Sequence, residues 1–330
     1  MIHEISPGPS LPKRGKEKAK ITIIVVKMIV LTLFAAFSFV PCFVFGQEVA
    51  LPPVNLGESN FLDGVAGPGL LFEQTIEYYR ANRFTDSKGN KIPGNNSLEN
   101  WLSLTHLAYL TKLKILGGYY GFEALLPAVW VDLNTDLGIG GHKGGVGDLI
   151  VSPFLIQWVD HKIFNMPYFH RIDLAFILPT GNYNNDSAIN IGSHVYSFNS
   201  YYALTLFITP KLETSWRFQY LWNSKNNSPP QSFHADSIQP GQAFHFNYAF
   251  SYEILNGLRA GIAGYYLNQI TPDKVDGHKR PHSKEEVFAI GPGLMYSRKG
   301  FFLYLNAYYE TGVENRPEGK KIAFRFSKAF

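Results

Sequence analysis

The stretch that decides the fold is the carboxyl-terminal run KKIAFRFSKAF, from Lys320 to Phe330. Side chains alternate across an extended chain, so one face carries Ile322, Phe324, Phe326 and Phe330, interrupted only by Lys328. A membrane barrel needs such a final strand, because its last strand pairs with its first and a rim aromatic lies at the lipid–water boundary. The run therefore predicts a β-barrel, with an edge strand of a soluble sheet as the alternative.

The amino terminus has the layout of a secretory signal peptide. Six Lys and Arg residues precede an apolar run, Met28 to Phe45, which the small residue Gly46 follows. We predict a signal peptide over residues 1–46, cleaved after Gly46. An uncleaved membrane anchor is the alternative, because residues 21–45 are long enough to span a bilayer. Residues 47–69 have no strong periodicity, and we expect a periplasmic tail there or a short segment folded into the barrel mouth.

Charge and cysteine content exclude several classes of protein. The signal holds six of the 30 Lys and Arg residues and two of the 26 Asp and Glu residues, which leaves 24 of each sign. The mature chain is formally neutral, so no nucleic-acid partner is expected. The one cysteine, Cys42, leaves with the signal, which excludes a disulfide, a thiolate nucleophile and a zinc–cysteine site.

The remaining chain, residues 70–330, predicts a transmembrane barrel of about twelve strands. Aromatic residues make up 15% of the chain, yet mean hydropathy is −0.07. This balance is typical of strands with alternate residues facing lipid, although a large soluble all-β protein competes. Long and short connections alternate, as in up-and-down barrels, whereas a Greek-key sandwich would scatter them. The predicted strands are 70–83, 100–110, 113–131, 147–158, 168–178, 196–208, 211–222, 242–253, 257–269, 286–297, 301–311 and 320–330.

Two predicted strands distinguish the lipid face from the lumen. In 211–222 and 242–253, aromatic side chains such as Phe218 and Phe246 alternate with polar ones. We expect the aromatic face to contact lipid. The same register predicts a polar lumen, either a salt-bridge network that fixes the register or a pathway for solutes. Its members are Glu73, Glu77, Glu123, Arg171, Asp173, Glu213, Arg217, His245, Glu253, Arg259, Glu310 and Arg325, and we expect Arg171, Asp173 and Arg217 to pair across the lumen or along its wall.

The sequence holds little that predicts chemistry. It contains no His-Glu-x-x-His motif and no paired cysteines, so we predict no metal, no cofactor and no catalytic residue. Ser251 and His245 are both expected in the lumen. A barrel phospholipase would need its Ser–His pair at the lipid-facing surface, so an enzyme is the least favoured of three functional hypotheses.

Five stretches resemble the bacterial family of meta-pathway phenol-degradation proteins, which are outer-membrane barrels of transporter type. They are Gly145–Leu149 with Pro153; Leu178–Tyr183; Gly264–Tyr266 with Gln269 and Asp273; Ala289–Pro292; and Glu310–Gly319. The resemblance extends from Gly67 to Phe330 and brings no catalytic residue with it. The aromatic ending also resembles the signal read by the barrel-assembly machinery of the bacterial outer membrane.

This resemblance implies passive uptake of small hydrophobic or aromatic compounds, linked to phenol catabolism. The expected partners are outer-membrane lipid, the solute and the assembly machinery. The alternative is a structural or adhesion barrel that acts through its extracellular loops.

Overall fold

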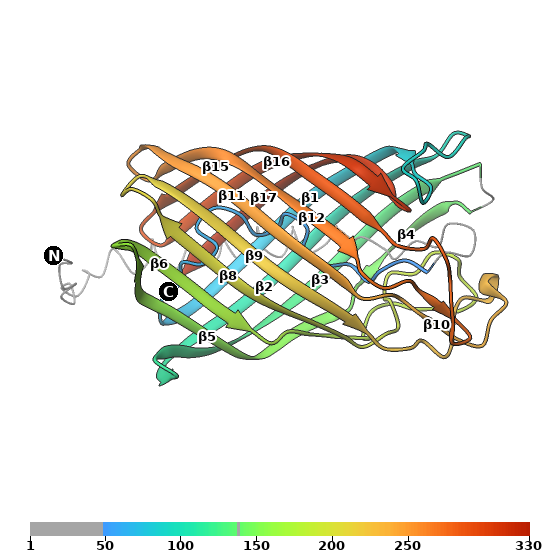
Figure 1. Cartoon of the computed structure of the whole chain (residues 1–330), viewed down its shortest axis with the longest axis horizontal. Coiled ribbons are helices and arrows are strands. Elements are labelled where there is room, and N and C mark those ends of the chain that lie inside the picture. The colour runs from blue at the N-terminus through green and yellow to red at the C-terminus, as the bar shows by residue number, and fades with distance from the viewer. Residues whose placement is uncertain (1–48, 137–138) are drawn as a thin grey trace, which may run out of the picture. The chain divides into compact units, whose positions relative to one another are not determined.

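The computed structural model describes residues 49–136 and 139–330, so the predicted signal peptide lies outside the described residues. The described chain forms a closed, antiparallel, 12-stranded β-barrel (Figure 1). The number of predicted strands therefore equals the number of strands in the barrel wall. Two of these twelve are interrupted, so each is divided into two shorter strands: β4 and β5 in one, β6 and β7 in the other.

The strands of the wall, in order, are β1 (Gly69–Phe84), β2 (Ser97–Ile115), β3 (Gly118–Asn134), β4 (Gly141–Val146), β5 (Leu149–Ile163), β6 (Met166–Asp173), β7 (Phe176–Leu178), β8 (Ser197–Phe207), β9 (Leu212–Asn223), β11 (Ala243–Leu255), β12 (Leu258–Gln269), β15 (Glu286–Arg298), β16 (Phe301–Glu314) and β17 (Pro317–Ala329). The loops add a 3-10 turn, η1 (Gln231–Phe233), and a small sheet of β10 (Ile238–Gln239), β13 (Lys274–Val275) and β14 (His278–Lys279).

The barrel closes where β17 pairs with β1, with Ala329 opposite Leu71 at one end and Pro317 opposite Phe84 at the other. Closure pairs the first strand of the wall with the last, as a spanning sheet requires, because lipid offers no hydrogen bonds to exposed backbone groups. The carboxyl-terminal run thus occupies the closing position that its pattern predicts.

Two hairpins are tighter than the sequence suggests. The predicted boundary near residue 111 is wrong, because β2 and β3 continue to a two-residue turn at Leu116 and Gly117. The expected loop at 159–167 is likewise mostly strand, with its turn at Phe164 and Asn165. All four turn residues have positive φ, which matches the twist of a two-residue hairpin. Only one of the four is glycine, so composition gave a weak signal.

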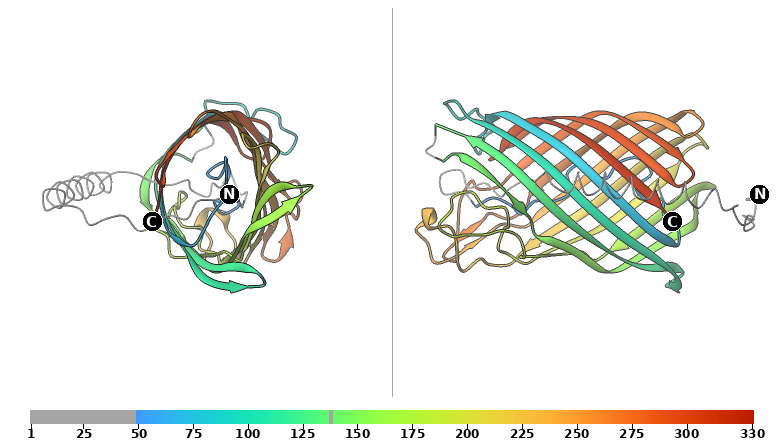
Figure 2. Two further views of the ribbon diagram at one scale, coloured as in Figure 1. Left: turned by 90° about the vertical axis from the view of Figure 1, so that its left-hand side faces the viewer. Right: turned by 180° about the vertical axis from the view of Figure 1, so that it is seen from behind.

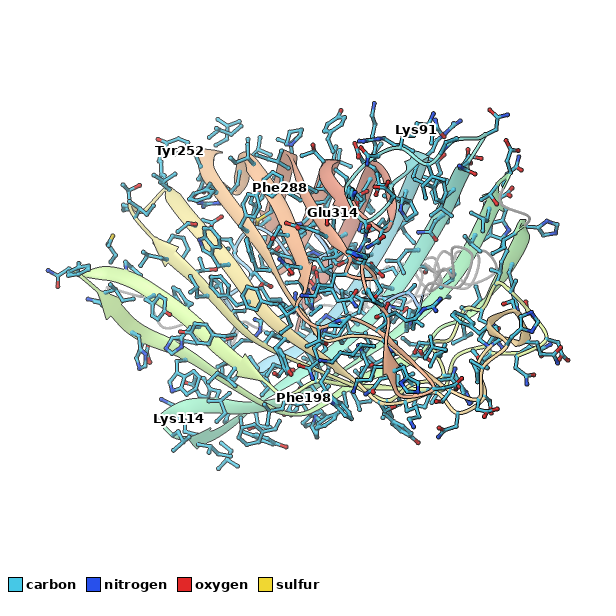
Figure 3. All side chains as sticks on the ribbon, turned by 45° about the vertical axis from the view of Figure 1, so that its right-hand side comes forward. Lys91, Lys114, Phe198, Tyr252, Phe288 and Glu314 are labelled. Atoms are coloured by element: carbon cyan, nitrogen blue, oxygen red, sulfur yellow. The ribbon has the colours of Figure 1, made fainter. Side chains whose placement is uncertain are left out.

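The two ends of the barrel differ in their connections (Figure 2). The short hairpins and the carboxyl terminus share one end, and the long loops share the other; in Figure 3 Tyr252 lies toward the first end and Lys91 at the second. We call these the periplasmic and external ends, after the loop lengths of outer-membrane barrels. One external connection is an exception, because Asn315 and Arg316 alone join β16 to β17.

The two faces of the wall follow the predicted alternation. In β17, Ile322 and Phe324 are exposed on the outside, whereas Ala323 and Arg325 are buried inside. The outward aromatics of β9 and β11 form a contiguous cluster around Trp216. An exposed apolar exterior is suited to lipid and not to water. None of the helices in the described residues has the length and apolarity needed to cross a membrane.

Candidate functional site in the barrel lumen

Residues 49–68, which we call the plug, run through the lumen. At the external end Val49 packs against Phe233. Toward the periplasmic end the N–H of Gly64 donates to Thr205 Oγ1 of β8 at 2.8 Å. Figure 2 (left) shows this segment in blue inside the ring of strands. The largest buried cluster of the molecule therefore combines plug residues with the inner wall.

The plug is the main departure from the expected organisation. Residues 47–69 were expected as a periplasmic tail or a segment at the barrel mouth, and from Val49 onward they occupy the depth of the lumen. An irregular chain at membrane depth must find partners for its backbone groups within the protein. Individual wall side chains provide those partners in place of a regular backbone ladder. The segment therefore needs no repeating sequence pattern, and sequence analysis had none to detect.

Close packing fixes the middle of the plug. The N–H of Gly57 donates to Asn247 Oδ1 at 3.0 Å, and its carbonyl accepts from the Tyr308 hydroxyl at 2.7 Å. Gly57 has φ +96, and a Cβ there would lie 3.0 Å from the Tyr308 ring, so glycine is required. Phe61 is fully buried against Gly293 of β15, where a Cβ would lie 2.7 Å from the phenylalanine ring.

Two wall arginines hold a plug carboxylate. Asp63 Oδ1 lies 2.6 Å from Arg217 Nη2 and 3.2 Å from Arg171 Nη2, and its Oδ2 accepts from Arg217 Nε at 2.9 Å. Opposite charges at this distance favour the ionised form of the carboxyl group over its neutral form. Asp63 therefore stays ionised and neutralises part of the charge of two buried guanidinium groups.

A chain of polar contacts continues from this clamp around the wall. Arg171 Nε donates to the Tyr201 hydroxyl at 3.2 Å, and that hydroxyl donates to Glu123 Oε1 at 3.1 Å. His106 then lies between two carboxylates, with Nε2 3.1 Å from Glu123 and Nδ1 2.9 Å from Glu73. Strands from β6 and β8 to β1 are thereby linked through one network.

A second set of charges grips the plug from β17. Arg325 Nη1 donates to the backbone carbonyl of Glu58 at 2.9 Å, and its Nε lies 3.8 Å from Glu73. Lys321 Nζ lies 2.9 Å from Glu77 Oε1 and 3.5 Å from Glu58 Oε1. Two inward-facing charged residues of the final strand, Lys321 and Arg325, therefore bind the segment that occupies the lumen.

The structure corrects one predicted pairing. Asp173 is fully buried, but no ion pair joins it to Arg171 or Arg217. Both arginines bind Asp63 instead, because the plug places a carboxylate between them. The prediction of an Arg–Asp–Arg pairing within the wall is wrong since it did not include a chain segment inside the lumen.

The other predicted lumen residues also lie inside the barrel. Ser251 donates to Glu213, and Arg259 Nε donates to Ser251 Oγ at 2.9 Å while its Nη1 lies 3.5 Å from Glu253. His245 is fully buried and hydrogen-bonds to Gln219 of the adjacent strand β9 and to Asn199 of β8, the next strand along the wall. Ser251 and His245 thus form no Ser–His pair.

The carboxylate of Glu310 in β16 links two other strands of the wall, β1 and β12. Glu310 accepts hydrogen bonds from the hydroxyl groups of Tyr79 at 2.6 Å and Tyr265 at 2.8 Å. Within residues 49–136 and 139–330, no group of three or more His, Cys, Asp or Glu side chains is placed to hold a metal ion. The polar residues described above bind one another and the plug through ion pairs and hydrogen bonds.

The inner wall also has an apolar region, which we call the apolar inner face. It lies on the external halves of β2 and β3 and comprises Leu98, Leu102, Val129, Val131 and Leu133, all buried. Ile189 and Ile191 of the loop between β7 and β8 pack against it. These wall residues face inward, so they do not contact lipid, and the loop isoleucines cover them in this structure.

Sequence reasoning missed several residues of the lumen. Lys321 shares the inward face of Arg325 four residues away, so the alternation could have found it. His106 could have been found in the same way from the register of β2. Asp63 and Glu58 had no such signal, because they lie in a segment without secondary structure.

The fold and its lumen define a class: an outer-membrane β-barrel whose interior is filled by its own amino-terminal segment. A family model described as "Putative MetA-pathway of phenol degradation" matches residues 81–326. The chain belongs to this family. No curated protein sequence matches it.

Solved structures support the fold assignment. The chain is similar to the COG4313 outer membrane channel from Pseudomonas putida F1, at 18% identity and a TM-score of 0.70, covering 81% of this chain and 97% of that one. It is less similar to the β-domain of the Bordetella autotransporter BrkA, at 13% identity and TM-score 0.46, covering 80% and 100%. The TodX monoaromatic hydrocarbon channel, as a deletion mutant, gives 10% identity and TM-score 0.43, covering 81% and 92%. The last two are too dissimilar to bear on function.

Proposed function

We propose that this barrel is a passive channel for small hydrophobic or aromatic compounds, closed at rest by its plug. The observation that carries the proposal is the apolar inner face, with Leu102 and Val131 near its centre. A barrel that served only as a structural support would need no apolar surface on the inside of its wall, where most positions are polar. An apolar solute would partition onto this surface once Ile189 and Ile191 move away from it.

The family description and the channel fold support this proposal. The family is described by phenol degradation, and the P. putida protein of the same fold is an outer membrane channel. Neither the family description nor the channel fold requires the barrel to catalyse a reaction, and the polar residues of the lumen bind one another and the plug. We infer a transport role and no enzymatic one.

Dye uptake into intact cells tests the proposal. Porin-deficient cells expressing the protein should take up N-phenyl-1-naphthylamine, a hydrophobic dye, several times faster than cells with an empty vector. The substitutions Val129→Thr and Val131→Thr keep side-chain shape but add hydroxyl groups to the apolar inner face, so together they should slow uptake. Outer-membrane amounts are matched by immunoblot. Uptake equal to that of the empty vector, from a barrel shown to be folded, would instead favour an adhesion or structural role.

A further inference from the structure

A cavity of about 120 Å³ lies between the plug and the wall in the external half of the lumen. Residues 50–54, 56 and 58 of the plug form one side, and β1, β2, β12, β16 and β17 contribute to the other. An apolar protein cavity of roughly 150 Å³ is known to hold one benzene molecule. The space therefore suits a single small ring.

The cavity has an apolar side and a charged side. Leu51, Pro53, Leu98 and Leu267 contribute apolar surface. Glu58, Glu77 and Arg316 contribute charge, and each has one buried polar atom without a hydrogen bond or an ion-pair partner: Glu58 Oε2, Glu77 Oε2 and Arg316 Nε. Glu77 Oε1 is paired, because it lies 2.9 Å from Lys321 Nζ. Three of the unpaired buried polar atoms of the described chain thus belong to residues that line this one space.

These atoms specify what a guest must offer. A buried polar group left without a hydrogen bond costs about 1–3 kcal/mol. Two of the three atoms are carboxylate oxygens, which only accept, so the preferred guest carries a donor. Four carboxylates line the space, from Glu58, Glu77, Glu285 and Glu310, against the two cations Arg316 and Lys321. This balance disfavours an anionic guest.

We propose that this cavity is a binding site for a small, neutral, hydroxylated aromatic compound, with phenol as the simplest case. The ring would lie against the leucine and proline side chains, and the hydroxyl would donate to Glu58 or Glu77 and accept from Arg316 Nε. The proposal rests on the proposed function and names its solute class. Because the plug forms much of the site, release of the plug dismantles it.

Equilibrium binding of phenol and toluene to the purified full-length barrel in detergent tests the site. Toluene has the same shape but no donor, so phenol should bind at least tenfold more tightly after correction for partition into empty micelles. Leu98→Phe fills the cavity and should abolish binding of both compounds. Glu58→Gln keeps the side-chain size and should weaken phenol binding at least fivefold while leaving toluene unchanged. Glu314→Gln, outside the cavity, is the matched control and should bind phenol like wild type.

Two results would overturn the proposal: equal binding of phenol and toluene, or phenol binding that survives Leu98→Phe in a folded barrel. No detectable binding of either compound would show a cavity filled by water only and would overturn it as well. The two experiments distinguish failure of the binding site from failure of the channel function. Dye uptake without phenol binding would remove the site and keep the channel. Phenol binding without dye uptake would keep the site and remove the channel.

Discussion

Release of the plug by Asp63→Asn is the sharpest test of how the lumen works. The substitution removes the only carboxylate that pairs with both Arg171 and Arg217 in the described chain. In the plugged state it leaves two buried guanidinium groups without a carboxylate in direct ion-pair contact. In the released state water can solvate both, so the cost falls on the plugged state alone.

The expected free-energy cost of Asp63→Asn follows from the burial of the ion pairs that Asp63 forms with Arg171 and Arg217. Removing one partner of a buried ion pair costs about 3–5 kcal/mol. Each 1.4 kcal/mol is tenfold, so the ratio of released to plugged barrels should rise roughly 10²- to 10⁴-fold. Single-channel recording in planar bilayers measures this directly as the fraction of time spent open. Deletion of residues 49–66 should give the upper limit, a barrel that stays open.

The control is Asp86→Asn, because Asp86 lies in an exposed external hairpin where it binds Lys88 and Asn90. Its open fraction should equal that of wild type. Folding of each variant is checked by circular dichroism and heat-modifiable migration. A deletion variant that is folded but conducts like wild type would refute the plug as the element that closes the channel.

Three further predictions concern assembly, membrane register and the external loops. Deletion of Phe330, which is exposed at the periplasmic rim, should lower outer-membrane yield if the assembly machinery reads it, and pulse-chase fractionation measures this. Phe246→Arg, on the lipid face near mid-strand, should cost about 2–4 kcal/mol in urea unfolding, and Tyr252→Arg, on the same face near the rim, about 0–1 kcal/mol; equal costs would contradict the register. Burial raises the pKa of Asp273 in an external loop to about 8, so its neutral form favours the folded loop and stability falls as pH rises from about 4 to 8. Protease nicking of the loops should therefore increase toward pH 8 in wild type, and not in Asp273→Asn.

The wall was predictable from sequence because the residues of each barrel strand alternate between the lipid face and the lumen. In β17, alternation alone placed Phe324 outside and Arg325 inside, and the structure agrees. The errors lie where backbone conformation, not side-chain pattern, decides. Phe164 adopts a positive φ of 49°, which little in its residue type indicates, so a two-residue turn was taken for a loop.

The contents of the lumen were not predictable by the same means. Register identifies which side chains face inward, but it does not say what they face. Arg171 and Arg217 were correctly turned to the lumen, yet their partner lies about 110 and 150 residues earlier in a segment without periodicity. β6 and β9 each carry one inward arginine and one inward carboxylate, Asp173 or Glu213, so the balance of inward charges did not indicate an anionic segment between them.

The polarity of the plug is itself an argument for release. Asp63 is held by charge, Gly57 by hydrogen bonds to Asn247 and Tyr308, and Glu58 by its carbonyl bond to Arg325. Water can replace each of these partners when the segment leaves, so the net free energy of each bond is only about 0.5–1.5 kcal/mol for neutral groups. An apolar plug of the same length would lose burial that water does not return. Four plug side chains are exceptions, because Val49, Leu51, Leu56 and Phe61 are buried, and exposing each of them would cost about 1.5–3 kcal/mol. These apolar contacts hold the segment in place, while the exchangeable polar contacts lower the cost of displacing it below that of a wholly apolar filling.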